Sequence, residues 1–151
     1  MSLRKPSKRG ATGRLLGRRR FLATAAASGA ALSLDLPAVL ANRADVLKTF
    51  FDMGGSVVDS SPMYGSSEDV IGYCLDRIGR RDDLFSATKV WTPLIADGET
   101  QMADSRKLWG VEKFDLMQVH NLVNWEGHLE TLAEDKAAGR VRHIGITTSH
   151  G

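Results

Sequence analysis

The sequence predicts an α/β fold: part of a (β/α)8 TIM barrel, with about four parallel strands alternating with helices. Short runs rich in β-branched residues alternate with longer segments whose apolar residues have helical spacing. No glycine-rich phosphate loop follows the first strand, where an open dinucleotide-binding sheet would carry one. A polar residue instead closes each predicted strand, as is typical of the reactive face of a barrel. These residues are Asp59, Lys89, His120 and Thr147.

The front of the chain, residues 1–41, differs from the rest in charge. It carries eight basic residues and one acid, whereas residues 42–151 carry 12 basic and 17 acidic residues, a net charge of −5. The charge of +2 for the whole chain therefore hides an acidic body, which predicts no nucleic-acid partner.

The same front segment has the layout of an export peptide. The stretch RRRFL at 18–22 resembles a twin-arginine motif, an uncharged alanine-rich stretch follows, and residues 39–41 (VLA) resemble a cleavage site. We therefore expect a twin-arginine-type signal over 1–41, the twin-arginine translocation machinery as a partner, and a periplasmic or exported bacterial protein. The alternative is a basic tail on a cytoplasmic protein, and neither hypothesis includes 1–41 in the fold.

The body of the chain, residues 42–151, is predicted to form a helix followed by a βαβαβαβ series. Apolar spacing in ANRADVLKTFFDMGG predicts the first helix, which the two glycines end. Serine at 66 or 67 is the expected N-cap of the second helix, and Asn124 that of the fourth. The predicted strands are 56–60, 83–91, 113–121 and 141–149, and the later helices are 66–79, 97–109 and 124–139.

Cysteine and histidine add little chemistry of their own. The one cysteine, Cys74, excludes an intrachain disulfide and is expected to be a small buried side chain. His128 falls within a predicted helix and is expected on the surface. No cluster in the sequence has metal-ligand spacing, so no metal site is predicted.

Four residues form the candidate catalytic site: Asp59, Tyr64, Lys89 and His120. In a barrel the strand ends meet at one mouth, so these side chains are expected to converge there. A phenol ordinarily titrates near pH 10, and a neighbouring ammonium group favours its ionised form. An aspartate would hold the lysine, and a histidine could hydrogen-bond a substrate oxygen. The set suits a proton donor for a carbonyl that becomes an alcohol.

These residues lie in stretches that resemble the aldo-keto reductases, (β/α)8 barrels that reduce aldehydes and ketones with NADPH. The stretches are GGSVVDSSPMYGSSEDVIG, LFSATKVW, FDLMQVHN and GRVRHIGITT, and the resemblance covers nearly all of 44–151. It implies that Tyr64 is the general acid while a hydride passes from the nicotinamide to the carbonyl carbon. It also implies that Lys89 makes the phenol more acidic, that Asp59 supports Lys89, and that His120 orients the carbonyl.

The resemblance extends more weakly to the cofactor and substrate pockets. Thr147 and Thr148 stand where the family commonly has Ser-Asn, which binds the nicotinamide carboxamide, so cofactor contacts are carried over without the amide. Trp91, just after the lysine strand, is expected either to line the pocket mouth or to pack in the core.

Chain length leaves two hypotheses open. A whole barrel takes roughly 250 residues, and about 110 remain after the front segment. One hypothesis is an NADPH-dependent reductase of an aldehyde or ketone. The other is a non-catalytic, truncated remnant that binds no cofactor. Either way, four strands would leave two unpaired edges, through which self-association is expected.

Overall fold

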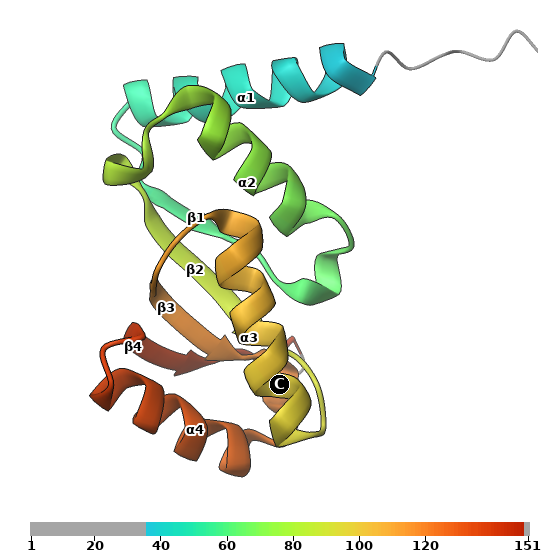
Figure 1. Ribbon diagram of the computed structural model, residues 1–151, viewed down its shortest axis with the longest axis vertical. Coiled ribbons are helices and arrows are strands. Elements are labelled where there is room, and N and C mark those ends of the chain that lie inside the picture. Colours follow the sequence, from blue (N-terminus) through green and yellow to red (C-terminus); the bar gives the residue numbers. More distant parts are fainter. Residues whose placement is uncertain (1–35, 150–151) are drawn as a thin grey trace, which may run out of the picture. The chain divides into compact units, whose positions relative to one another are not determined.

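The computed structural model describes residues 36–149, and in that range four parallel strands alternate with helices (Figure 1). The longer helices are α1 (Leu36–Asp52), α2 (Ser67–Ile78), α3 (Ile95–Trp109) and α4 (Trp125–Ala137). The strands are β1 (Val57–Asp59), β2 (Phe85–Val90), β3 (Phe114–Val119) and β4 (Val141–Ile146). Short 3-10 helices are η1 (Pro62–Tyr64), η2 (Arg81–Asp83) and η3 (His120–Leu122).

The sheet confirms the predicted α/β class and strand number. Its order is β1-β2-β3-β4 and every pair is parallel, as expected for successive right-handed crossovers. The register pairs Asp59 with Ala87 and Lys89 with Gln118, so the candidate residues share one face of the sheet. Within the described range, β1 and β4 have no further strand beside them.

The hydrophobic core lies between the other face of the sheet and the helices, which contact one another in chain order (Figure 1). Leu75, Trp109, Met117 and Leu132 are completely buried there. On the face that carries Asp59, Val57 remains 58% exposed. The helices therefore cover one face of the sheet, as they cover the outer face of a barrel. The face that carries Asp59 corresponds to the inner face of a barrel.

A buried carboxylate ties α2 to the core. Glu68, only 3% exposed, accepts hydrogen bonds from Thr88 Oγ1 at 2.6 Å and Trp109 Nε1 at 3.1 Å through Oε1. Its Oε2 accepts from Ser105 Oγ at 2.9 Å. Three donors compensate for the burial of the carboxylate, so the Glu68 cluster (Glu68, Thr88, Ser105 and Trp109) joins α2, β2 and α3.

The N-cap residues of α2 and α4 stand at positions that the sequence predicts, Ser66 and Asn124, but their side chains make no capping bond. Gly79 and Gly110 follow α2 and α3 in the left-handed conformation that ends many helices. Ser66 precedes α2 without a side-chain capping bond, and Ser67 Oγ instead lies 2.6 Å from Ser60 Oγ. Asn124 stands at the start of α4 with φ 45°, and its side chain also makes no cap. Ser67 and Asn124 each bond a neighbouring segment instead of their own helix.

Burial corrects one expectation and confirms another. His128 was expected on the surface, which is wrong, because its ring is completely buried against Gly98 of α3. Gly98 has no side chain, and this leaves space for the His128 ring. The pattern of apolar residues in α4 gave no indication of this contact. Cys74 is buried as predicted, and this burial raises the pKa of its thiol.

The predicted export segment lies mostly outside the described residues, including the twin-arginine motif. The structure shows α1 beginning at Leu36, so the last six residues of that segment, with the expected cleavage site, are helical. None of the helices in the described range is long and apolar enough to cross a membrane.

Candidate active site

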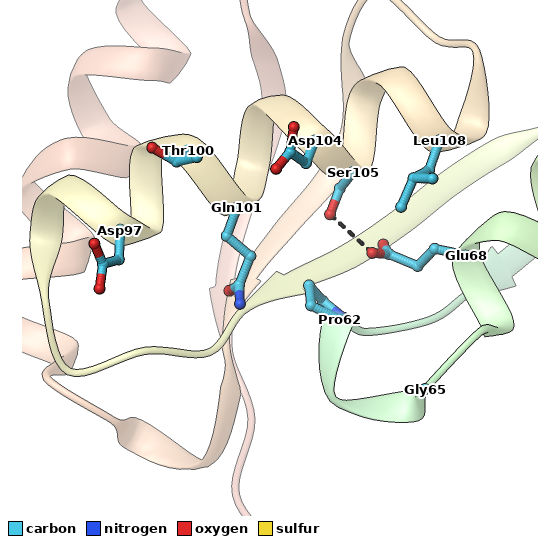
Figure 2. Close-up of a pocket in the computed structure, with 9 residues that line it drawn as sticks. All are labelled: Pro62, Gly65, Glu68, Asp97, Thr100, Gln101, Asp104, Ser105 and Leu108. Carbon is cyan, nitrogen blue, oxygen red and sulfur yellow. Dashed lines mark hydrogen bonds between the residues drawn. The ribbon is translucent and has the colours of Figure 1, made fainter. Parts of the chain in front are cut away.

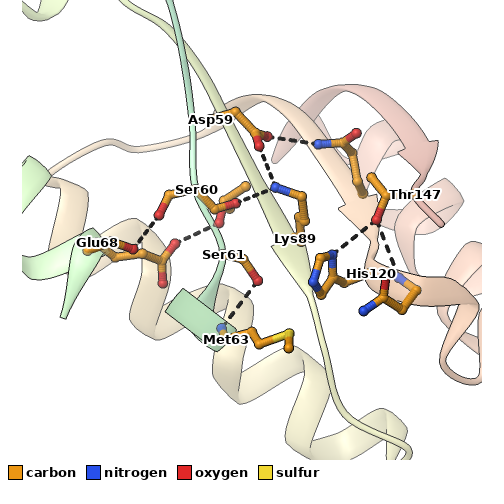
Figure 3. A network of polar contacts seen from close by, with 12 residues as sticks. Asp59, Ser60, Ser61, Met63, Glu68, Lys89, His120 and Thr147 are labelled. Carbon is orange, nitrogen blue, oxygen red and sulfur yellow. Dashed lines mark hydrogen bonds and ion pairs between the residues drawn. The ribbon is translucent and has the colours of Figure 1, made fainter. Parts of the chain in front are cut away.

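The four predicted catalytic residues meet at the C-terminal ends of the strands, and Figure 3 shows three of them, Asp59, Lys89 and His120. Asp59 is the last residue of β1, and Lys89 lies one residue before the end of β2. His120 directly follows β3, and Tyr64 ends η1 in the loop after β1. The convergence expected from strand order alone is therefore present.

Lys89 is the buried centre of the site. It is 3% exposed, its Nζ is ion-paired with Asp59 Oδ2, and it donates a hydrogen bond to the backbone oxygen of Ser60 at 2.8 Å. The same nitrogen lies 5.1 Å from the centroid of the Tyr64 ring. The positive charge of Lys89 is thus balanced by the Asp59 carboxylate of β1, and the ammonium group faces the Tyr64 ring.

Asp59 is held on both of its carboxylate oxygens. Its Oδ1 accepts a hydrogen bond from Gln118 Nε2 at 3.0 Å, while Oδ2 faces Lys89. Gln118 was missed by the sequence analysis. It lies two residues before His120 on β3 and pairs with Lys89, so strand alternation could have placed it on the same face.

His120 is 7% exposed, and its Nδ1 lies 3.0 Å from Thr147 Oγ1, just after β4 (Figure 3). The same hydroxyl oxygen accepts from the backbone N–H of Asn121 at 3.3 Å, so its own hydrogen is available to Nδ1. This contact is compatible with a neutral ring that carries its proton on Nε2. Burial, with a smaller contribution from the Lys89 charge, lowers the pKa of His120 below its ordinary value of 6.5, which favours the neutral ring.

Tyr64 is held by a short, internally bonded loop. Ser61 Oγ accepts from the backbone N–H of Met63 at 3.2 Å, and Pro62 opens the 3-10 turn that ends at the tyrosine. The phenol ring is 48% exposed and packs edge-to-face with His120, with centroids 5.8 Å apart. The two rings therefore stand side by side above Lys89, with the phenol open to an incoming molecule.

Trp91 lies two residues after Lys89 and lines a cavity that none of the four predicted catalytic residues lines, so its place at the mouth of the catalytic pocket stays a prediction. Its side chain is 40% exposed at a cavity of about 520 Å³. The lining residues are Pro62, Trp91, Thr92, Pro93, Asp97, Gln101 and Val123.

A second cavity, of about 410 Å³, lies between the start of α2 and α3 (Figure 2). Glu68 and Gln101 line it, and Pro62, Asp97 and Gln101 line both cavities. Its lining is otherwise Gly65, Thr100, Asp104, Ser105 and Leu108. Among the described residues, no group of three or more acidic, histidine or cysteine side chains is placed to hold a metal ion.

The fold is that of part of a parallel (β/α)8 barrel, and aspartate, lysine and histidine stand at or next to its strand ends with a tyrosine in the loop after the first strand. The chain belongs to the aldo/keto reductase family, because the sequence model of that family matches residues 32–150.

Among curated proteins, the chain is similar to the aldo-keto reductase str7 of Strobilurus tenacellus. The two are 33% identical over 114 residues, which are 70% of this chain and 34% of that protein. The chain spans about a third of the length of the curated relatives that it matches.

Solved structures support the fold. The holo form of an aldo-keto reductase from Bacillus halodurans superposes with a TM-score of 0.65 at 24% identity, over 73% of this chain and 42% of that one. An aldo-keto reductase from Klebsiella pneumoniae in complex with NADPH gives a TM-score of 0.64 at 23% identity, over 72% and 40%. The four strands and their helices therefore match part of the (β/α)8 barrel.

Proposed function

We propose that this chain provides the proton-donating half of an NADPH-dependent reductase that converts an aldehyde or ketone to an alcohol. One observation supports the proposal above all others. The buried Lys89 ammonium lies between the Asp59 carboxylate and the exposed Tyr64 phenol, with His120 packed against the same phenol. An acid, its activating cation and a neutral hydrogen-bond donor thus face one point at the strand ends.

Each side chain has a distinct role in the proposed reaction. The Tyr64 hydroxyl donates its proton to the carbonyl oxygen as that oxygen gains negative charge. The Lys89 ammonium stabilises the phenolate that remains, and Asp59 keeps Lys89 in place. His120, neutral with its proton on Nε2, donates a hydrogen bond that orients the carbonyl.

NADPH is the proposed cofactor, because the family and the complexed Klebsiella pneumoniae relative both point to it. When bound, it supplies the hydride that reduces the carbonyl carbon. The described residues fit its reacting end, since the donors of Tyr64 and His120 lie together beside the open inner face of the sheet. Thr147 and Thr148 are the proposed contacts for the carboxamide, with the Thr147 hydroxyl already placed 3.0 Å from His120.

We further propose that residues 1–41 direct the protein through the twin-arginine translocation machinery to the periplasm. The support is the order of basic motif, apolar stretch and cleavage site in the sequence. Mass spectrometry of the chain recovered from periplasm and cytoplasm tests this, and an intact chain confined to the cytoplasm would contradict it. Self-association through the edges of β1 and β4 is a separate proposal, which sedimentation velocity tests.

The central experiment uses the full chain with NADPH and 4-nitrobenzaldehyde as the carbonyl probe. We expect saturable quenching of tryptophan fluorescence by NADPH, and NADPH oxidation when the aldehyde is added. Tyr64→Phe should lower kcat/KM by about 10²- to 10⁴-fold, the usual contribution of a general acid.

Tyr73→Phe is the matched control, because Tyr73 is the other tyrosine of the chain and lies on α2, away from the strand ends. It should leave turnover unchanged. A folded sample that neither quenches nor oxidises NADPH would overturn the proposal and favour a non-catalytic member of the family.

A further inference from the structure

The segment that follows β2, residues 91–93, is held by side chains from the next two helices. Gln101 of α3 contacts Trp91 twice. Its Oε1 accepts from the Trp91 backbone N–H at 2.6 Å, and its Nε2 donates to the Trp91 carbonyl at 3.2 Å. This pair of bonds fixes the peptide groups on both sides of the Trp91 side chain.

Two residues of the α4 region continue the same pattern. His128 Nε2 lies 2.7 Å from the carbonyl oxygen of Thr92, and Asn124 Nδ2 donates to the carbonyl of Pro93 at 2.9 Å. Three consecutive carbonyls thus each receive one side-chain N–H. We name Gln101, Asn124 and His128 the loop clamp.

The imidazole of His128 has one tautomer that suits this contact. A carbonyl oxygen only accepts, so the proton resides on Nε2. The Nδ1 atom is buried and has no partner among the described residues. A Cβ built on Gly98 would stand 2.5 Å from the Cε1 atom of the ring, so the ring has little room to move.

The histidine at this position carries a cost at Nδ1 as well as a bond at Nε2. Burying a polar nitrogen without a partner costs about 1–3 kcal/mol, and an apolar side chain of similar size would avoid that cost. The Thr92 carbonyl accepts from a ring that is completely buried, so this bond joins the loop to the interior of the protein. What His128 adds is a fixed position for that loop.

The fixed loop carries Trp91, two residues after Lys89. Its half-exposed indole lines the 520 Å³ cavity together with Pro62 and Val123. Aromatic molecules pack well on such a flat apolar surface. This cavity adjoins the loop of Tyr64 through Pro62, two residues before the phenol, so its shape on that side depends on where the backbone of residue 91 is held.

We propose that the loop clamp residues are positioning residues that hold Trp91 at the rim of the pocket and thereby set the affinity for aromatic carbonyl substrates. The proposal rests on the reductase function above. Since the clamp does not touch the reacting groups, its loss acts on substrate binding and leaves the proton transfer from Tyr64 intact.

The test compares four forms of the full chain: wild type, His128→Leu, His128→Gln and Thr131→Val. Leucine removes the donor to Thr92, whereas glutamine retains an N–H that can reach it. Thr131→Val is the matched control, because Thr131 lies on the same helix and its hydroxyl bonds only the helix's own Gly127 carbonyl in the described hydrogen bonds.

We expect His128→Leu to raise KM for 4-nitrobenzaldehyde about tenfold, as for the loss of one buried hydrogen bond, with kcat within about twofold. His128→Gln should restore most of the lost affinity, and Thr131→Val should change neither constant. An unchanged KM in His128→Leu, or a fall in kcat instead, overturns the proposal.

Amide exchange at Trp91 gives a readout that needs no turnover. Loosening the loop in His128→Leu should speed exchange of the Trp91 N–H about tenfold, and unchanged exchange contradicts the clamp. If wild type binds no NADPH and yet its Trp91 amide follows this prediction, the reductase proposal fails and the clamp remains. If His128→Leu does not fold, Asn124→Gly replaces it, because Asn124 is exposed and already has a positive φ.

Discussion

Two polar clusters lie on opposite faces of strand β2, and similar chemical groups have different roles in them. Thr88 and Lys89 are neighbours on β2, so their side chains point to opposite faces of the sheet. Thr88 belongs to the Glu68 cluster, where every donor meets a buried carboxylate. Lys89 belongs to a second group, the site cluster (Asp59, Tyr64, Lys89 and His120), where Asp59 and Tyr64 remain 43% and 48% exposed.

The difference lies in what each cluster leaves available. In the Glu68 cluster the hydrogen-bonding capacity is used within the protein, which stabilises the packing of α2 and α3 on the sheet. In the site cluster the compensated cation is buried, while the phenol and the carboxylate face outward. Burial with full satisfaction indicates a structural role, and partial exposure around a buried charge indicates a chemical one.

Breaking the Glu68 cluster should have the largest effect on stability. Glu68→Ala leaves three buried donors without an acceptor, so we expect the free energy of unfolding to fall by about 3–5 kcal/mol. Urea denaturation measures it. Glu68→Gln retains an acceptor oxygen and should lose clearly less. A loss below about 1 kcal/mol in the alanine variant would show that the cluster contributes little.

The corresponding change in the site cluster should affect catalysis instead. Lys89→Met removes the cation near Tyr64, and we expect kcat/KM to fall by about 10²- to 10³-fold. Asp59 is partly exposed and can be solvated, so the free energy of unfolding should change by about 1 kcal/mol or less. Arg142→Met, which breaks the exposed ion pair with Asp115, is the control for loss of an ion pair. If Lys89→Met unfolded the protein, the site cluster would have a structural role like that of the Glu68 cluster.

Gln118 offers a finer test of how Asp59 is oriented. Gln118→Leu removes the hydrogen bond to Oδ1, and a loss of about 1 kcal/mol corresponds to about a fivefold decrease in kcat/KM. Gln118→Glu should be worse, since it places a like charge beside Asp59. Steady-state kinetics of the two variants measure these effects. Wild-type activity in both variants would show that Asp59 does not need the hydrogen bond from Gln118.

The smallest expected effect concerns pH. Because the pKa of His120 is lowered in the folded state, the unfolded chain binds its proton more readily. This residue therefore contributes full stability above its ordinary value of 6.5 and loses part of it as pH falls below that value. Urea midpoints of wild type and His120→Asn between about pH 5 and 8 measure the difference. Parallel pH profiles would mean that burial does not disfavour the charged ring.

The sequence by itself determined the order of elements, the parallel sheet and the four strand-end residues. Strand ends can be predicted because β-branched runs stop at polar residues, and parallel strands bring those ends to one edge. The pairing of Asp59 with Lys89 followed from their chemistry and was confirmed. The glycine C-caps were also predictable, since few other residues adopt a left-handed conformation.

Only the tertiary structure decided which polar side chains serve other segments. Gln118, Asn124 and His128 each bond a group more than 30 residues away in the chain, and no local pattern specifies such a partner. Asn124 was expected to cap its own helix, and His128 was expected in solvent. Their roles depend on which helix packs against which loop, and this packing is fixed by side chains distant in sequence, which local spacing does not encode.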